Sequence, residues 1–273
     1  MDRPALSLEP LTLPDVGALE LIDIADQTGF AATSLILNSP SFTMPADPIV
    51  ADLELRKAAL DRLTQAGIDI LNIECFNLCA DADPESFHAG LACGFEFGAR
   101  AASTIVWENG DRSDVLAKLT RLCDMAQDFG IRINLEFMAP SKSMSSLDVA
   151  LDLVRDSRRK NIGLMIDILH LMRTGGTIDR LREIDPELIG GAQLCDGRLR
   201  ISEGDMLAEA GGNRLVPGQG QFPVREFIDA LPQELIIGVE TPQISLVGKV
   251  APLERARQLM LAVQPLIGAR IAA

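Results

Sequence analysis

Four polar residues, three of them carboxylates, stand at or near the ends of apolar segments in the second half of the chain. Glu136 follows INL, Asp167 follows GLMI, Gln193 lies within GAQLC, and Glu240 follows IIGV. Side chains alternate between the two faces of a strand, and each polar residue has the opposite parity to its aliphatic neighbours. If the segments are strands of one barrel, all four polar groups point inward.

Three carboxylates that converge on one barrel mouth need a counter-charge. They would repel one another and raise one another's pKa unless they are protonated or bound to a cation. A divalent metal resolves this conflict, and an all-oxygen set of three carboxylates and one amide favours Mn²⁺ or Mg²⁺, with Co²⁺ or Zn²⁺ as alternatives. The competing interpretation is that arginine or lysine side chains neutralise some of the carboxylates.

Asp167 is followed three residues later by His170. The apolar run from Ile162 is typical of a strand buried on both faces, with Asp167 at its carboxyl end. Residues three apart cannot share a face of one strand, so we expect His170 in the following loop or turn, where ligands bind in parallel α/β folds. The alternative for Asp167 is that it caps the next helix.

Strand and helix patterns alternate along the whole chain, and helix C-terminal glycines are expected at Gly29, Gly67, Gly98 and Gly130. The predicted strands are Ala5–Leu11, Ala32–Leu37, Ile70–Phe76, Ser103–Trp107, Ile131–Phe137, Ile162–Asp167, Ile189–Cys195 and Leu235–Glu240. Predicted helices include Val16–Thr28, Ala51–Ala66, Asp114–Phe129, Ser146–Arg158 and Leu253–Val263. Eight strand-helix units favour an α/β fold of the closed (β/α)8 TIM-barrel type over an open doubly wound sheet. Because no linker interrupts the pattern, we expect residues 1–273 to form one domain.

Composition is that of a soluble globular protein. Hydrophobic residues make up 47% of the 273 residues and charged residues 23%. The net charge of −14 disfavours nucleic acid or an anionic membrane as a partner. The five scattered cysteines lack the spacing of a zinc site, and no stretch reaches the roughly 18 apolar residues that a transmembrane helix requires. We therefore expect a cytoplasmic protein with reduced cysteines that binds a small molecule.

The chain resembles the xylose isomerase-like TIM-barrel superfamily in four features. These are Glu136, Asp167 with His170, a polar residue in the seventh strand followed by Asp196, and the motif VETP at Glu240. The resemblance implies that Glu136, Asp167, Gln193 and Glu240 bind the metal, and that His170 contacts the substrate or assists proton transfer. Many epimerases of the superfamily have histidine where this chain has Gln193, and the glutamine is similar to what 3-dehydroshikimate dehydratases of this fold can show. The apurinic endonucleases of the superfamily use many histidines, whereas this chain has two.

Further residues are candidates for contacts to the substrate. Arg214, in RLVPGQG, looks like the superfamily arginine that contacts an anionic or hydroxyl-rich substrate; the alternative is a surface turn with a solvated arginine. Trp107 and Glu108 end the fourth strand and could wall the pocket with an apolar face, although Trp107 could equally be core. We expect Glu74 to line the pocket. Lys142 is a weaker candidate, because a single loop lysine is usually solvated.

These groups favour proton abstraction next to a carbonyl, with a metal-stabilised enolate and with Glu136 or Glu240 as the base. The leading hypothesis is a divalent-metal-dependent isomerase or epimerase of a sugar, sugar phosphate or cyclitol. The alternative is a lyase of the 3-dehydroshikimate dehydratase type, and a catalytically idle barrel that binds a small molecule is the third hypothesis. The expected partner is a polyhydroxylated small molecule, and a homo-oligomer remains open.

Overall fold

The computed structural model describes residues 3–39, 45–107 and 109–268. Eight parallel strands follow one another around a closed barrel, and β1 pairs with β8 to complete it. The strands are Leu6–Leu8 (β1), Ala32–Ile36 (β2), Asp69–Asn77 (β3), Ala101–Ile105 (β4), Arg132–Glu136 (β5), Ile162–Asp167 (β6), Ile189–Leu194 (β7) and Ile237–Val239 (β8). The predicted (β/α)8 barrel is confirmed, and the predicted strands coincide with these to within a few residues.

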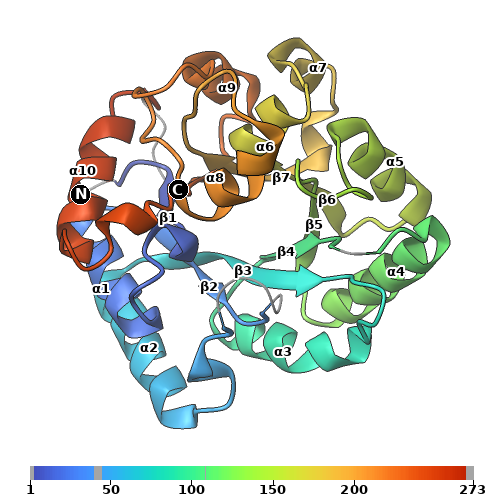
Figure 1. The fold of residues 1–273 in the computed structure, drawn as a ribbon. Helices are drawn as coiled ribbons and strands as arrows, with labels where there is room; N and C mark the ends of the chain where they lie inside the picture. The colour runs from blue at the N-terminus through green and yellow to red at the C-terminus, as the bar shows by residue number, and fades with distance from the viewer. Residues whose placement is uncertain (1–2, 40–44, 108, 269–273) are drawn as a thin grey trace.

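The helices form a ring around the strands, as Figure 1 shows. They are Ala18–Thr28 (α1), Leu53–Ala66 (α2), His88–Glu96 (α3), Arg112–Asp128 (α4), Leu147–Ser157 (α5), Ile168–Arg173 (α6), Ile178–Arg182 (α7), Met206–Gly212 (α8), Val224–Ala230 (α9) and Pro252–Val263 (α10). α10 packs against α1, so the helical ring closes where the barrel closes. Gly29 and Gly67 end α1 and α2 with φ of 85° and 62°, the left-handed conformation that the sequence predicts there.

The hydrophobic core lies between the strands and the helices. In β5, Ile133 and Leu135 are fully buried in this layer. The residues that alternate with them, Asn134 and Glu136, have the opposite parity and point into the barrel. The parity argument from the sequence therefore describes β5 correctly.

Small polar side chains occupy much of the barrel interior below the mouth. Ser7, Ser34, Asn72, Ser103 and Asn134 are all buried, where many barrels of this kind carry branched aliphatic residues. Asn72 Nδ2 donates to Ser103 Oγ at 2.8 Å and to Glu74 Oε1 at 3.0 Å. The barrel interior below the mouth is therefore polar and supports the carboxylates above it.

All five cysteines are free. Within the described residues, no helix is both long and apolar enough to cross a bilayer.

Candidate active site

Four strand ends bring the four predicted polar residues together at the carboxyl end of the barrel. Register places Asp167 beside Gln193 in the β6–β7 pair, and Gln193 opposite Gly238, two residues before Glu240. Glu136 ends β5, next to β6. All four side chains are buried, because they point into the barrel and not toward the helices.

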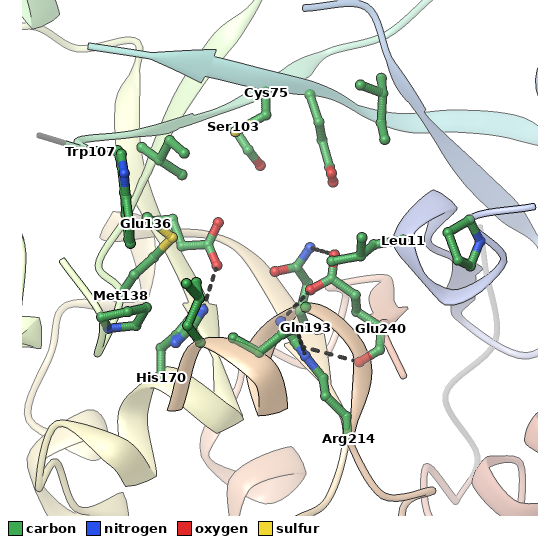
Figure 2. A pocket seen from close by; sticks show the side chains of 18 of the residues that line it. Leu11, Cys75, Ser103, Trp107, Glu136, Met138, His170, Gln193, Arg214 and Glu240 are labelled. Carbon is green, nitrogen blue, oxygen red and sulfur yellow. Dashed lines mark hydrogen bonds and ion pairs between the residues drawn. The ribbon is translucent and has the colours of Figure 1, made fainter. Parts of the chain in front are cut away.

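Arg214 lies between two of these carboxylates. Its Nη1 is 2.6 Å from Asp167 Oδ2, and its Nη2 is 2.9 Å from Glu240 Oε2. Figure 2 shows the guanidinium beside Glu240 and Gln193, in the lower part of the view. The alternative of a solvated surface arginine is wrong, since Arg214 is 3% exposed. The interpretation that a basic residue neutralises some of the carboxylates is correct for Asp167 and Glu240.

Asp167 uses its two oxygens for different tasks. Oδ1 accepts a hydrogen bond from the backbone N–H of Leu169 at 2.7 Å and so caps α6, while Oδ2 pairs with Arg214. The capping interpretation is therefore correct, and Asp167 also lies among the polar residues at the barrel mouth. His170 lies inside α6, and not in a loop or turn, because Asp167 starts a helix directly at the end of the strand.

Gln193 has one amide atom in use and one unpartnered. Its Nε2 donates to Glu240 Oε1 at 3.1 Å, so the other amide atom, Oε1 of Gln193, points away from Glu240. Oε1 is buried and has no hydrogen-bond partner among the described residues. A buried carbonyl oxygen without a partner is costly, so this atom is suited to a cation or to a donor group that enters the site.

Glu136 and Glu240 have raised pKa values. Burial is the main cause for Glu136, and the neighbouring charges of Asp167 and Glu240 raise its pKa further, well above the ordinary range. Burial also raises the pKa of Glu240, to about 7, although Arg214 acts in the opposite direction. Burial would lower the pKa of Arg214, but the charges of Asp167 and Glu240 outweigh it and raise that pKa.

His170 faces Glu136 and Asp167 as a neutral ring. Its Nε2 is 3.8 Å from Glu136 Oε1 and 4.0 Å from Asp167 Oδ2, and burial lowers its pKa to about 4. The backbone N–H of Ala139 donates to Nδ1 at 3.4 Å. Nδ1 is then an acceptor, so the proton of the neutral ring is on Nε2, the nitrogen that faces the carboxylates.

A cavity of about 530 Å³ opens above these groups. It is lined by Glu136, His170, Gln193, Arg214 and Glu240 and also by the predicted Trp107 and Glu74. Burial, followed by the charge of Glu9, raises the pKa of Glu74 well above the ordinary range.

Two further candidates are not part of this set. Lys142 is exposed and does not line the cavity. Glu108, which we considered together with Trp107, lies outside the described residues.

Two important residues were missed as parts of the site. Glu9 is 1% exposed and follows β1, and its pKa is raised, chiefly by burial. The motif LSLEP has the same pattern of apolar residues followed by an acidic one as the later strands, so Glu9 could have been predicted from the sequence. Asp196, which figured only in the resemblance, orders the loop after β7: its carboxylate accepts from the backbone N–H groups of Gly197, Gly218, Gly220 and Phe222 at 2.8–3.0 Å.

The donor groups suit a divalent cation. Single ligand atoms of Glu136, Asp167 and His170 lie within 4.8 Å of one another, and Gln193 offers the unpartnered Oε1 described above. Burial, followed by the negative charges of Asp167 and Glu240, raises the pKa of Glu136, and a bound cation would favour its ionised form. A cluster of this composition could therefore hold a metal ion.

Fold and site define a closed parallel α/β barrel with a buried, carboxylate-rich mouth. A family model described as "Xylose isomerase-like TIM barrel" matches residues 3–264, and the chain therefore belongs to this family. The resemblance noted in the sequence is confirmed.

Individual relatives are similar over part of their length. The inosose isomerase of Bacillus subtilis (strain 168) is 30% identical over 114 residues, which are 41% of this chain and 40% of that protein. The 3-dehydroshikimate dehydratase of Pseudomonas aeruginosa (strain PAO1) is 25% identical over 177 residues, 65% of this chain and 23% of that protein. This chain thus matches less than half the length of either relative. A crystal structure of the IOLI protein with a binding zinc atom has the same fold, with a TM-score of 0.78 and 18% identity over 100% of both chains.

Proposed function

We propose that this protein is a divalent-metal-dependent isomerase or epimerase of an uncharged sugar or cyclitol. The observation that carries the proposal is the placement of two buried carboxylates, Glu136 and Glu240, on opposite sides of one cavity (Figure 2). Burial raises the pKa of Glu136 well above its ordinary range and that of Glu240 to about 7, which suits both carboxylates to proton transfer. The similarity to an inosose isomerase supports the same reaction class.

Each residue has a role in this proposal. One carboxylate removes the proton next to the substrate carbonyl, and the other returns it from the opposite side. The neutral His170 donates a hydrogen bond from Nε2 to a substrate oxygen, and Arg214 keeps Asp167 and Glu240 oriented. Glu136, Asp167, Gln193 and Glu240 would hold the metal, which when bound stabilises the negative charge that develops on the carbonyl oxygen.

The charges of the cavity favour an uncharged substrate over a sugar phosphate. Arg214 is the one cationic side chain among the described residues that line the cavity, and it is already paired with two carboxylates. Among the described residues that line the cavity, a phosphate would therefore find acidic groups and no unpaired arginine or lysine.

A dehydratase is the second candidate, and the match of 65% of this chain to a 3-dehydroshikimate dehydratase favours it. In that reaction the same base removes the proton, and a β-hydroxyl leaves as water. The carboxylate of dehydroshikimate would likewise find no unpaired arginine or lysine among the described residues that line the cavity. We therefore place the dehydratase second.

Proton exchange tests the proposal. Purified protein with Mn²⁺ is incubated in D₂O with a panel of neutral ketoses and inososes, and NMR follows the entry of deuterium next to the carbonyl. We expect exchange with at least one substrate, and a loss of roughly 10²- to 10⁴-fold in Glu136→Gln and in Glu240→Gln.

The matched control is Glu226→Gln, an exposed glutamate of α9, which should exchange at the wild-type rate. Absence of deuterium from every substrate would contradict the isomerase proposal. A conjugated product from 3-dehydroshikimate would instead identify a dehydratase.

A further inference from the structure

The cavity has two chemically different parts. Its floor is formed by the carboxylates, Gln193 and His170, whereas the walls toward the mouth are apolar. Figure 2 shows Trp107 and Met138 on the side of Glu136, and Leu11 on the side of Glu240. Ile36, Leu207 and Ile244 also line this apolar part of the cavity. The proposed isomerase chemistry uses none of these side chains.

The apolar residues come from all around the barrel. Leu11 follows β1, Ile36 ends β2, and Trp107 and Met138 follow β4 and β5. Leu207 in α8 and Ile244 after β8 complete the rim, and their side chains remain 55% and 50% exposed. Apolar side chains that remain exposed at a cavity mouth typically mark a binding surface.

The rim residues are held in place by specific contacts. Glu209 in α8 forms a buried ion pair with Arg173, in which Oε2 is 2.6 Å from Nε. Gly212 leaves room for Ile244, since a Cβ at that position would lie 2.6 Å from Ile244 Cγ1. The backbone N–H of Arg214 donates to the carbonyl of Pro242 at 3.2 Å, which joins the loops after β7 and β8. These contacts hold Leu207 and Ile244 in defined positions at the mouth of the cavity.

Size also points to a ligand larger than one sugar ring. A cavity of about 530 Å³ lies within the range of roughly 300–1,000 Å³ that holds drug-sized ligands. A single six-membered polyol placed on the polar floor would leave the apolar rim in contact with water. Burial of that rim by an apolar part of the same ligand would add favourable free energy of binding.

We propose that the apolar rim is a second subsite, which binds an apolar group attached to the polyhydroxylated substrate. The substrate class is then an uncharged polyol ring with an aromatic or aliphatic substituent. This inference rests on the proposed function only for the place of the polyol on the floor.

The occupant is the substituent of the ligand and not another protein chain, because the rim continues directly into the cavity that contains the carboxylates.

Trp107 provides a direct measurement, because it is the single tryptophan of a chain without tyrosine and it lines the cavity. Its fluorescence is titrated with phenyl β-D-glucopyranoside and with methyl β-D-glucopyranoside. We expect the phenyl compound to shift the emission of Trp107 and to bind at least about tenfold more tightly. Leu207→Ser should weaken binding of the phenyl compound about tenfold and leave binding of the methyl compound unchanged.

The control is Leu53→Ser, an exposed leucine of α2 that is absent from the cavity lining, and it should alter neither titration. Equal or undetectable binding of the two compounds would overturn the subsite, as would an equal effect of Leu53→Ser and Leu207→Ser. The titration requires neither turnover nor added metal. The titration therefore still tests the subsite if the proton-exchange experiment fails. Proton exchange combined with equal binding of the two compounds would refute the subsite but not the proposed function.

Discussion

Arg214 shows at the level of single residues how a cluster of buried acids is balanced. Its guanidinium forms ion pairs with Asp167 and Glu240 but not with Glu136. Asp167 and Glu240 are thus paired with a cation, whereas Glu136 faces His170 at 3.8 Å and the Oε1 of Gln193 has no hydrogen-bond partner among the described residues. The balance is incomplete on the side of the cavity where His170 lies, which is where we place the incoming cation and the substrate oxygen.

The protonation of His170 can be tested directly. Burial lowers its pKa from 6.5 to about 4, so the ring should stay neutral from pH 5 upward. In metal-free His88→Gln, which leaves one histidine, we expect an NMR titration midpoint about two units below the ordinary value. Because the pKa is lowered in the folded state, this group should make the protein less stable as pH falls from 6.5 toward 4. A midpoint near 6.5 would contradict the lowered pKa, and a midpoint above 6.5 would indicate an ion pair with Glu136 or Asp167.

The loop after β7 carries Arg214 into the site, and Asp196 orders it. Four backbone N–H groups, two of them from Gly218 and Gly220, donate to one carboxylate. Gly218 has a φ of 90°, which the turn requires and glycine permits without strain. A Cβ on Gly220 would lie 2.1 Å from Asp196 Oδ1, so that the motif VPGQG and Asp196 depend on each other.

Asp196→Asn should loosen this loop while it preserves the size of the side chain. The amide offers one acceptor oxygen in place of two, so about half of the N–H groups lose their acceptor. Each charge-assisted bond contributes roughly 1.5–3 kcal/mol, and we expect hydrogen exchange at Gly218 and Gly220 to accelerate at least about tenfold. The control is Asp205→Asn, at an exposed residue that ends the short 3-10 helix before α8 and whose side chain makes no capping hydrogen bond. Equal exchange in the two variants would mean that Asp196 does not order the loop.

At the level of the whole molecule, the closed barrel brings the carboxyl ends of eight strands to one mouth. Glu9 after β1, Glu74 on β3 and Glu240 after β8 are distant in sequence, and the closure between β1 and β8 makes them neighbours of one acidic pocket. Burial of so many acids destabilises the fold unless protons, Arg214 or a metal offset the charge. Metal binding should therefore stabilise the entire domain.

Metal removal measures this coupling. If the folded state alone binds Mn²⁺, a hundredfold excess over Kd adds about 2.7 kcal/mol to the free energy of unfolding. That corresponds to a rise in Tm of roughly 5–10 °C over the EDTA-treated protein. Glu136→Gln should show a smaller rise, and Glu226→Gln the wild-type rise, with metal content near one ion per chain by mass spectrometry. An unchanged Tm and no bound metal would favour the idle-barrel hypothesis.

The sequence alone determined the barrel and the identity of most floor residues. Strand alternation and helix C-terminal glycines are local signals, so the strand order, the parity of Glu136 and Glu240, and the turns at Gly29 and Gly67 could be predicted from neighbouring residues. Only the tertiary structure decided which charges meet. Arg214 is 47 residues from Asp167 and 26 from Glu240, and no local pattern reports a pairing over that distance. The apolar rim was equally hidden, because Leu11, Leu207 and Ile244 become neighbours of one cavity only when the barrel closes.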